Sequence, residues 1–264
     1  MYQTSTASTG GTDSAAGNNA AQYGYGTMTG TIAMDMIAGI PTYVGNFNAV
    51  INGQGFFIVR SNKADITNED LKSSGCSFTR VGQFTVDNNG YIVDSGNNFV
   101  FGFLKEDPDD PDSSYQTDTL KPLRLTDVEG TIIEGDDDEP AIASSIEINN
   151  MGIITAKITD QDGNEKTVTI GKVAIASFQN PEGLTKSGGH YFTTNGNDNA
   201  GDCTASEPGS GSTPSLMTGY VEGSNVDLAK EFSELIMAQR GFQANSKIIT
   251  VSDEILNELV NMKR

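Results

Sequence analysis

The sequence predicts a mainly β protein, in which a turn-rich antiparallel β domain is followed by one long C-terminal α-helix. Three observations support this class. The 264 residues include 30 glycines and many Asn and Asp residues, which favour tight turns between strands. Short apolar runs alternate with these turns up to residue 222. From residue 223 onward, the apolar residues recur at the spacing of a helix instead.

The first 22 residues are mostly Ser, Thr, Gly, Ala and Asn, with few large apolar side chains. Such a segment buries too little apolar surface to offset its ordering entropy, so we predict a flexible polar arm over residues 1–22. The main β domain is predicted to comprise residues 23–103 and 145–222. Inside it, two apolar runs flank residues 52–55, Asn-Gly-Gln-Gly, which predict a β-hairpin because glycine adopts the positive φ of a tight turn.

A three-stranded meander is predicted over residues 78–103. Its apolar runs are separated by Asp-Asn-Asn-Gly at residues 87–90 and by Ser-Gly-Asn-Asn at residues 95–98. Both sequences are rich in the residues that β-turns require. The spacing of runs and turns therefore indicates antiparallel neighbours.

A second β unit is predicted over residues 143–178, with turns at residues 149–152 and 160–163. Its strand–turn rhythm is similar to that of the meander and indicates internal repetition. Between the two units, residues 104–144 predict a short acidic insertion, in which proline-bearing acidic loops surround a strand at residues 120–125.

A C-terminal helix is predicted over residues 223–264, with Ser224 as its N-cap and Asp227 three residues further on. Apolar residues recur along it every seven positions, with a parallel row beside them. They form a heptad-like seam about 50 Å long at 1.5 Å per residue. The candidate assembly residues are Leu228, Phe232, Leu235, Phe242, Ile248, Ile249, Ile255, Leu256, Leu259 and Met262.

This seam has no evident partner within the sequence. A helix gains most of its stability by packing its apolar face, and no second long helix is predicted in the chain. We therefore predict that the seam packs against a helix of another chain or of sequence outside these residues. The alternative is an ordinary core helix that folds back on the sheet.

Composition excludes several classes of partner. The formal net charge of −19 disfavours nucleic acids and anionic membrane surfaces, because both are negatively charged. No apolar run approaches the ~20 residues that cross a bilayer, so no membrane insertion is predicted. The N-terminus lacks the basic and apolar segments of a secretory signal.

No catalytic or cofactor site is predicted, so the sequence does not indicate an enzyme. The single histidine, His190, lacks a motif that would place it beside a nucleophile. The acidic loops lack the EF-hand pattern, which favours solvated loops over calcium sites. Cys76 and Cys203 show no zinc-ligand spacing and could be either free or paired.

Two blocks of the sequence resemble bacterial flagellar rod and hook proteins. One block contains AVINGQGFFIV and FTRVGQFTVDNNGYIVDSGNNFVFGF, within residues 49–103. The other is GYVEGSNVDLAKEFSELIMAQRGFQANSKIITVSDEILNELVNM, residues 219–262, which resembles hook proteins more than distal rod proteins. The resemblance implies a β domain of hook and rod type, with residues 104–144 as a reduced outer domain.

The function implied by this resemblance is that of a structural subunit of the flagellar hook, the flexible tube that couples the rod to the filament. The alternative within the family is the distal rod protein, which forms a rigid drive shaft. A surface β protein that binds carbohydrate or mediates adhesion is a third possibility, from another class. A sugar or calcium site within residues 105–140 would favour it.

The resemblance also implies partners and location. Family members pair an N-terminal helix with the C-terminal helix, and we expect such a helix to precede these residues in the full protein. Gln239, Asn245 and Ser246 would fix the register of the seam or face the channel. The implied partners are further copies of the chain, the distal rod protein, the hook cap and the hook–filament junction proteins. The implied location is the flagellum outside the cell, reached by type III export without a cleavable signal peptide.

Overall fold

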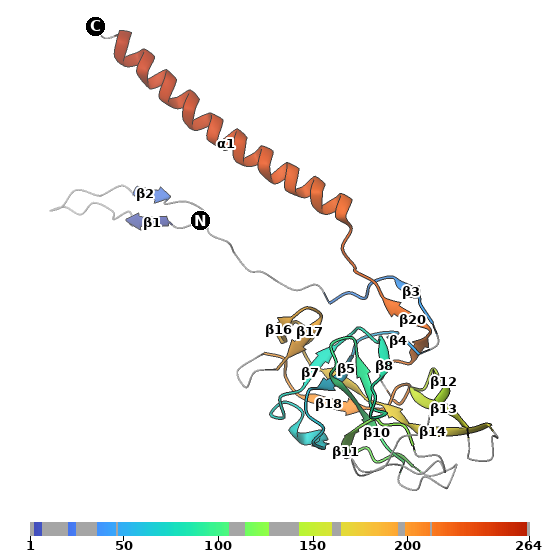
Figure 1. Ribbon diagram of the computed structural model, residues 1–264. Helices are drawn as coiled ribbons and strands as arrows, with labels where there is room; N and C mark the ends of the chain where they lie inside the picture. Colours follow the sequence, from blue (N-terminus) through green and yellow to red (C-terminus); the bar gives the residue numbers. More distant parts are fainter. Residues whose placement is uncertain are drawn as a thin grey trace, which may run out of the picture. The chain divides into compact units, whose positions relative to one another are not determined.

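The computed structural model contains a mainly β protein with one long C-terminal helix, which confirms the predicted fold class (Figure 1). The structure describes residues 3–6, 21–24, 36–45, 47–105, 114–126, 143–159, 165–194, 199–211 and 213–262. The chain divides into two units, Met1–Met36 and Ile37–Arg264. The second unit contains the β domain and the helix.

The first unit contains a pair of strands that the sequence does not predict. Strand β1 (Gln3–Thr6) pairs antiparallel with β2 (Ala21–Gly24), so that Thr4 lies opposite Tyr23. A predicted β domain that starts at Tyr23 therefore differs from the structure, in which Tyr23 pairs within the first unit. Backbone N–H and C=O groups form a ladder whatever their side chains are, so a polar composition does not reveal it. Residues 25–35 of the predicted β domain lie outside the described residues.

The β domain consists of one large antiparallel sheet and two short ladders. Among the described residues, the large sheet has 14 strands. Its main path is β12 (Ala143–Ile148), β13 (Ile153–Thr159), β14 (Glu165–Val173), β10 (Phe99–Phe103), β5 (Phe56–Arg60), β7 (Ser77–Thr79), β17 (Tyr191–Thr193) and β16 (Thr185–Gly188). The strands that branch from it are β6 (Ile66–Thr67), β8 (Phe84–Val86), β9 (Ile92–Asp94), β11 (Thr119–Pro122), β15 (Ile175–Phe178) and β18 (Cys203–Ser206).

The two short ladders join the two ends of the β domain. Strand β4 (Ala49–Ile51) pairs with β19 (Leu216–Thr218), and β3 (Pro41–Tyr43) pairs with β20 (Tyr220–Glu222). Each ladder thus combines a segment from the start of the domain with a segment from its end. Short 3₁₀ turns, η1 (Asn68–Asp70) and η2 (Pro181–Gly183), complete the domain.

Strand β5 is buried on both faces, which explains its uninterrupted apolar sequence. Phe57 and Val59 belong to the main core. Successive residues of a strand point to opposite faces, so Phe56 faces the other side. There it packs edge-on against Phe178 and Phe192, with ring centroids 5.7 and 5.6 Å away. Strand β5 therefore lies at the centre of the domain, with packed side chains on both of its faces.

The predicted meander is confirmed, and so are the strands of the second β unit. The predicted turn at residues 160–163 lies outside the described residues. One turn geometry recurs in the two units. Asp87 Oδ1 accepts hydrogen bonds from the backbone N–H groups of Asn89 and Tyr91, at 2.9 and 2.8 Å. Asp94 and Asn149 accept in the same way from residues two and four positions further on. The fourth residue of each turn has positive φ: Gly90, Asn97 and Gly152. The repeated rhythm of the sequence therefore corresponds to a repeated turn.

The predicted hairpin at residues 52–55 is wrong. Strands β4 and β5 flank these residues, but β4 pairs with β19, and β5 pairs with β7, β10 and β15. Gly53 and Gly55 have φ values of +152° and +149°, far from the values of a two-residue hairpin turn. The chain therefore passes from one ladder to another here without reversing onto itself.

Part of the segment predicted as an acidic insertion lies in the core. Strand β11 pairs with both β10 and β6, and the side chains of Leu120 and Leu123 are fully buried. Lys105 and Tyr115 form an isolated β-bridge between the two described ends of the first acidic loop. Residues 106–113 and 127–142, which hold most of the acidic residues of the predicted insertion, lie outside the described part of the chain.

The helix α1 (Leu228–Met262) is continuous over 35 residues, but it starts later than predicted. Its cap is Asp227, whose Oδ1 accepts from the backbone N–H groups of Ala229 and Lys230 at 2.9 and 3.3 Å. Ser224 Oγ accepts from the N–H of Val226 in the preceding turn. Both residues suit a cap position, and the aspartate occupies it.

Candidate assembly interface

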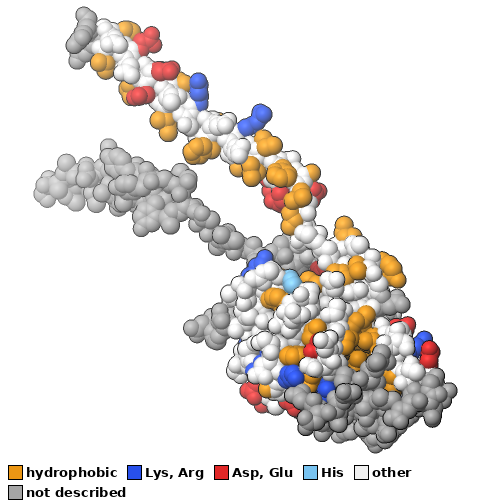
Figure 2. All heavy atoms as spheres, viewed as in Figure 1, with side chains coloured by type: hydrophobic (Ala, Val, Ile, Leu, Met, Phe, Trp, Pro, Cys, Tyr) orange, Lys and Arg blue, Asp and Glu red, His pale blue; other side chains and the backbone are white. Residues whose placement is uncertain are grey.

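Helix α1 exposes its apolar side chains along its described length. None of its residues is buried, and Figure 2 shows hydrophobic side chains spaced along it. All ten predicted assembly residues are exposed, from 51% for Leu235 to 79% for Met262. Large contiguous apolar surface on a protein is typical of a site that a partner covers. The alternative prediction, a core helix, requires buried residues that α1 does not have.

The apolar surface of α1 is broader than the predicted seam. Ile236, Met237, Val251 and Val260 are exposed apolar residues that the seven-residue rows omit. Leu235, Ile236 and Met237 are consecutive, so at about 100° per residue they span roughly 200° of the helix circumference. Counting every apolar residue of the predicted helix, instead of only those in the seven-residue rows, would have found them in the sequence. One partner helix cannot cover so wide an arc.

The segments on either side of the β domain meet in a region that we call the neck, residues 37–45 and 219–226. Here β3 and β20 pair from Pro41–Glu222 to Tyr43–Tyr220. The Gly223 N–H donates to the Ile40 carbonyl oxygen at 3.0 Å. The segment that leads into α1 therefore runs alongside the segment that begins the second unit.

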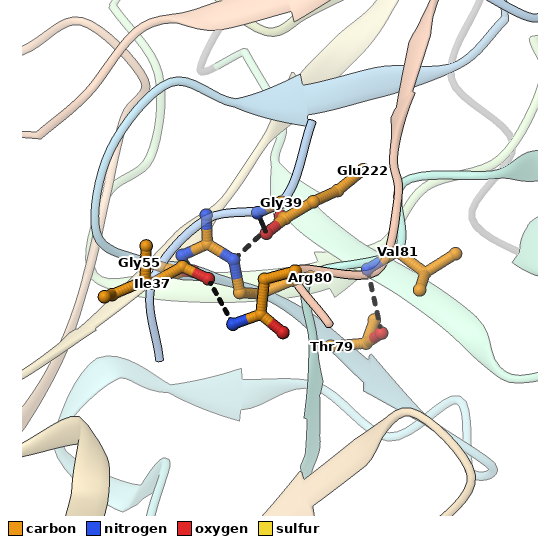
Figure 3. Close-up of polar contacts among 8 residues, drawn as sticks. Ile37, Gly39, Gly55, Thr79, Arg80, Val81 and Glu222 are labelled. Carbon is orange, nitrogen blue, oxygen red and sulfur yellow. Dashed lines mark hydrogen bonds and ion pairs between the residues drawn. The ribbon is translucent and has the colours of Figure 1, made fainter. Parts of the chain in front are cut away.

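A largely buried ion pair ties the neck to the large sheet (Figure 3). Glu222 Oε2 accepts from Arg80 Nε at 2.8 Å, and Glu222 Oε1 accepts from the backbone N–H of Gly39 at 2.9 Å. The side chains of Arg80 and Glu222 are only 14% and 10% exposed. The sequence does not indicate this pair, because its members lie 142 positions apart.

Both cysteines are free thiols in a poorly reactive environment. Cys76 is buried, with its Sγ 3.0 Å from Ser74 Oγ, and Cys203 is half-buried. Burial raises the pKa of the Cys76 thiol. Burial also raises the pKa of the Cys203 thiol, to about 12, with a further contribution from nearby Cys76. The thiolate is the reactive form, so neither side chain is suited to be a nucleophile.

We expect the folded chain to react slowly with iodoacetamide at about pH 8. A thiol with a pKa of about 12 carries at that pH roughly a thousandth of the thiolate of a thiol with a pKa of 9.0. Alkylation of Cys203 followed by mass spectrometry measures the rate. The same chain unfolded in guanidinium is the control, and equal rates in the two states would contradict the assignment.

The described residues offer no evident catalytic centre. They contain no cluster of three or more His, Cys, Asp or Glu side chains that could hold a metal ion. His190 packs its ring 4.1 Å from that of Tyr191, and its Nε2 atom is buried without a hydrogen-bond partner among the described residues. No described helix is both long and apolar enough to cross a membrane.

A β domain followed by a long helix with exposed apolar side chains is typical of the class of structural proteins whose helix is covered by a partner. Comparison with known proteins identifies the family within this class. Residues 217–262 match the family model described as flagellar basal body rod FlgEFG protein C-terminal. The chain is 33% identical over 249 residues to the flagellar basal-body rod protein FlgG of Bacillus subtilis. The aligned residues make up 94% of this chain and 77% of that protein. The chain therefore belongs to the flagellar rod and hook protein family.

Hook proteins match shorter parts of the chain. The flagellar hook protein FlgE of Borreliella burgdorferi is 47% identical over 94 residues, which are 36% of this chain and 21% of that protein. The hook protein FlgE of Escherichia coli is 34% identical over 125 residues, or 47% of this chain and 30% of that protein. The chain thus matches less than a third of the length of either hook protein.

Proposed function

We propose that the chain is a structural subunit that polymerises with copies of itself into the flagellar hook. The observation that carries the proposal is the unpartnered apolar surface of α1, in a chain that belongs to the rod and hook family. Burial of apolar area contributes about 25 cal/mol per Å², so covering this surface stabilises an assembly strongly.

The breadth of this surface favours a tube over a closed dimer. Leu235, Ile236 and Met237 face different directions around the helix axis, so each helix needs more than one neighbour. Contacts between unlike surfaces, repeated by a rotation that does not close, build an open helical polymer. Gln239, Asn245 and Ser246 interrupt the apolar rows and fix the register between neighbours, or face the channel.

The proposed role is mechanical and involves no enzymatic step or cofactor. The net charge of −19 keeps the subunits hydrated, which favours sliding polar contacts between β domains when the tube bends. The contacts between helices are apolar and persist during bending. The proposed partners at the ends of the tube are the distal rod protein, the hook cap and the hook–filament junction proteins. The proposed location is the flagellum outside the cell, reached by export without a cleavable signal peptide.

The second candidate within the family is the distal rod protein. It is favoured by the match to the Bacillus subtilis rod protein, which runs along 94% of the chain. The hook is favoured by the higher identity of the shorter match, 47% to the Borreliella burgdorferi hook protein. We do not propose the carbohydrate-binding alternative, because the match to the rod protein of Bacillus subtilis covers 94% of the chain.

Immunogold electron microscopy tests the proposal. Antibody against the β domain is applied to hook–basal bodies purified from the source bacterium, with a strain that lacks the gene as the control. We expect label along the curved hook and loss of the hook in the control strain. Label confined to the straight rod would show that the chain is a rod subunit and not a hook subunit. Normal hook–basal bodies without the chain would reject both candidates.

A further inference from the structure

We infer that Glu222 is a positioning residue for assembly, which locks the two segments of the neck to the large sheet and so fixes the base from which α1 starts. The inference rests on the proposed function, because it concerns how the assembling helix is attached. Its structural part can nevertheless be tested on the unassembled chain.

The carboxylate of Glu222 joins two different parts of the domain. Glu222 lies opposite Pro41 in the ladder of β3 and β20. Its Oε1 accepts from the backbone N–H of Gly39, two residues before Pro41, while its Oε2 accepts from Arg80 Nε. A hydrogen bond to a charged group is stronger than one between neutral groups.

The other partner, Arg80, is anchored on the large sheet. It follows directly after Thr79 of β7, and its Nη1 donates to the carbonyl oxygen of Gly55 at 3.4 Å (Figure 3). The Thr79 hydroxyl accepts from the N–H of Val81 at 3.1 Å and so holds the backbone around Arg80. Arg80 Nη2 is buried without a hydrogen-bond partner among the described residues. Glu222 is thus the ion-pair partner of a largely buried cation.

The two neck segments also touch through their backbones. A Cβ atom on Gly39 would overlap the carbonyl oxygen of Gly223, so only glycine permits this approach. Asn225 Nδ2 donates to the Ile37 carbonyl oxygen at 3.0 Å. These contacts extend from the end of β20 to within two residues of Asp227, the cap of α1. The helix therefore begins directly beyond the region that Glu222 holds.

A load carried by α1 reaches the β domain through this short region. The three-residue strands of the neck, their side-chain bonds, the Glu222–Arg80 pair and the backbone bond from the Gly219 N–H to the Asn48 carbonyl oxygen connect the helix to the rest of the domain. Loss of the pair removes the side-chain link between the ladder of β3 and β20 and Arg80, which follows β7. The neck then samples several arrangements, and helices from neighbouring subunits meet in the wrong register.

Two variants of the chain test the inference. Glu222→Gln removes the charge of the carboxylate, and the double variant Arg80→Met with Glu222→Gln removes both charges, so that no buried cation is left unpaired. The matched control is Glu207→Gln. It breaks the Lys172–Glu207 pair, which has a distance of 2.6 Å and side chains 9% and 21% exposed, away from the neck.

Hydrogen exchange by mass spectrometry on the unassembled chain is the first readout. We expect the Gly39 amide to exchange about tenfold faster or more in both neck variants. Strands β5 and β10 should keep their protection in the double variant, and Glu207→Gln should leave Gly39 unchanged. Unchanged exchange at Gly39 in the double variant, or equal loosening by Glu207→Gln, would overturn the inference.

The second readout is the number of tubes assembled in cells by the full-length protein. We expect at least a severalfold loss with the double variant and none with Glu207→Gln. A loosened Gly39 with normal assembly would show that Glu222 has only a structural role and would overturn the positioning role. Absence of the wild-type chain from the tube is a separate result, which would reject the proposed function without affecting the exchange measurement.

Discussion

Leu235→Asp or Phe242→Asp in the full-length protein is expected to abolish tube assembly while the β domain remains folded. In the unassembled chain these side chains are 51% and 77% exposed, so a carboxylate there meets water at little cost. In an assembled helix layer the same carboxylate would be desolvated without a partner, at a cost of roughly several kcal/mol per site. The cost recurs in every subunit of the polymer, so the effect on assembly is large.

Electron microscopy of hook–basal bodies measures tube assembly. Circular dichroism of the purified variants measures whether the β domain remains folded. The control is Asn261→Asp, which adds the same carboxylate to α1 outside the apolar rows. Hooks of normal number and length from cells that carry only Leu235→Asp would contradict the role of α1. Loss of assembly with Asn261→Asp as well would show that any added charge is harmful.

Phe57→Ala is expected to have the largest effect on the stability of the β domain. The Phe57 side chain is fully buried on β5, and its ring packs edge-on against that of Phe84, with centroids 5.2 Å apart. Truncation of a buried phenylalanine costs about 3–5 kcal/mol, against a total stability of about 5–15 kcal/mol for a typical domain. Urea unfolding followed by near-ultraviolet circular dichroism measures the change.

The matched control is Phe232→Ala, the same substitution on α1, where the side chain is 62% exposed. We expect it to leave the free energy of unfolding of the β domain unchanged and to weaken assembly. The two phenylalanines thus separate folding from polymerisation. Equal destabilisation of the β domain by both substitutions would mean that Phe232 belongs to its core.

Local patterns in the sequence predicted the elements whose partners are close along the chain. The meander follows from the turns at Asp87 and Asp94, where one side chain binds two backbone N–H groups of its own turn. The helix follows from its apolar period and from the absence of proline. In both cases the interactions that determine the structure lie within a few residues.

Elements held by distant partners were predicted wrongly or missed. The run before Gly53 was assigned to a hairpin, but β4 takes its partner from β19 near the end of the domain. Leu120 and Leu123 were assigned to an insertion, although the large sheet covers them. No local property of these residues distinguishes a hairpin from pairing with a distant strand, or an insertion from a core strand. Pairing depends on which strand occupies the neighbouring position in the sheet.

The candidate interface shows the same division. Its ten predicted residues were identified from the periodicity of one helix, which is a local property of the sequence. Their role as an interface stays a prediction. Ile236 and Met237 were missed because the seven-residue rows describe a narrow seam. The Arg80–Glu222 pair was missed because a charged residue in a sequence does not reveal its distant counterion. Only the spatial arrangement of the neck shows that both side chains are largely buried.

The absence of buried residues in α1 has a thermodynamic consequence for growth of the polymer. An isolated helix in water is only marginally favoured, since its apolar stripe contributes nothing until it is covered. Ordering of the last segment is then linked to the addition of each subunit, and the critical concentration depends on the helix–coil equilibrium of the free molecule. Conditions that stabilise the helix of the free subunit should therefore lower that concentration.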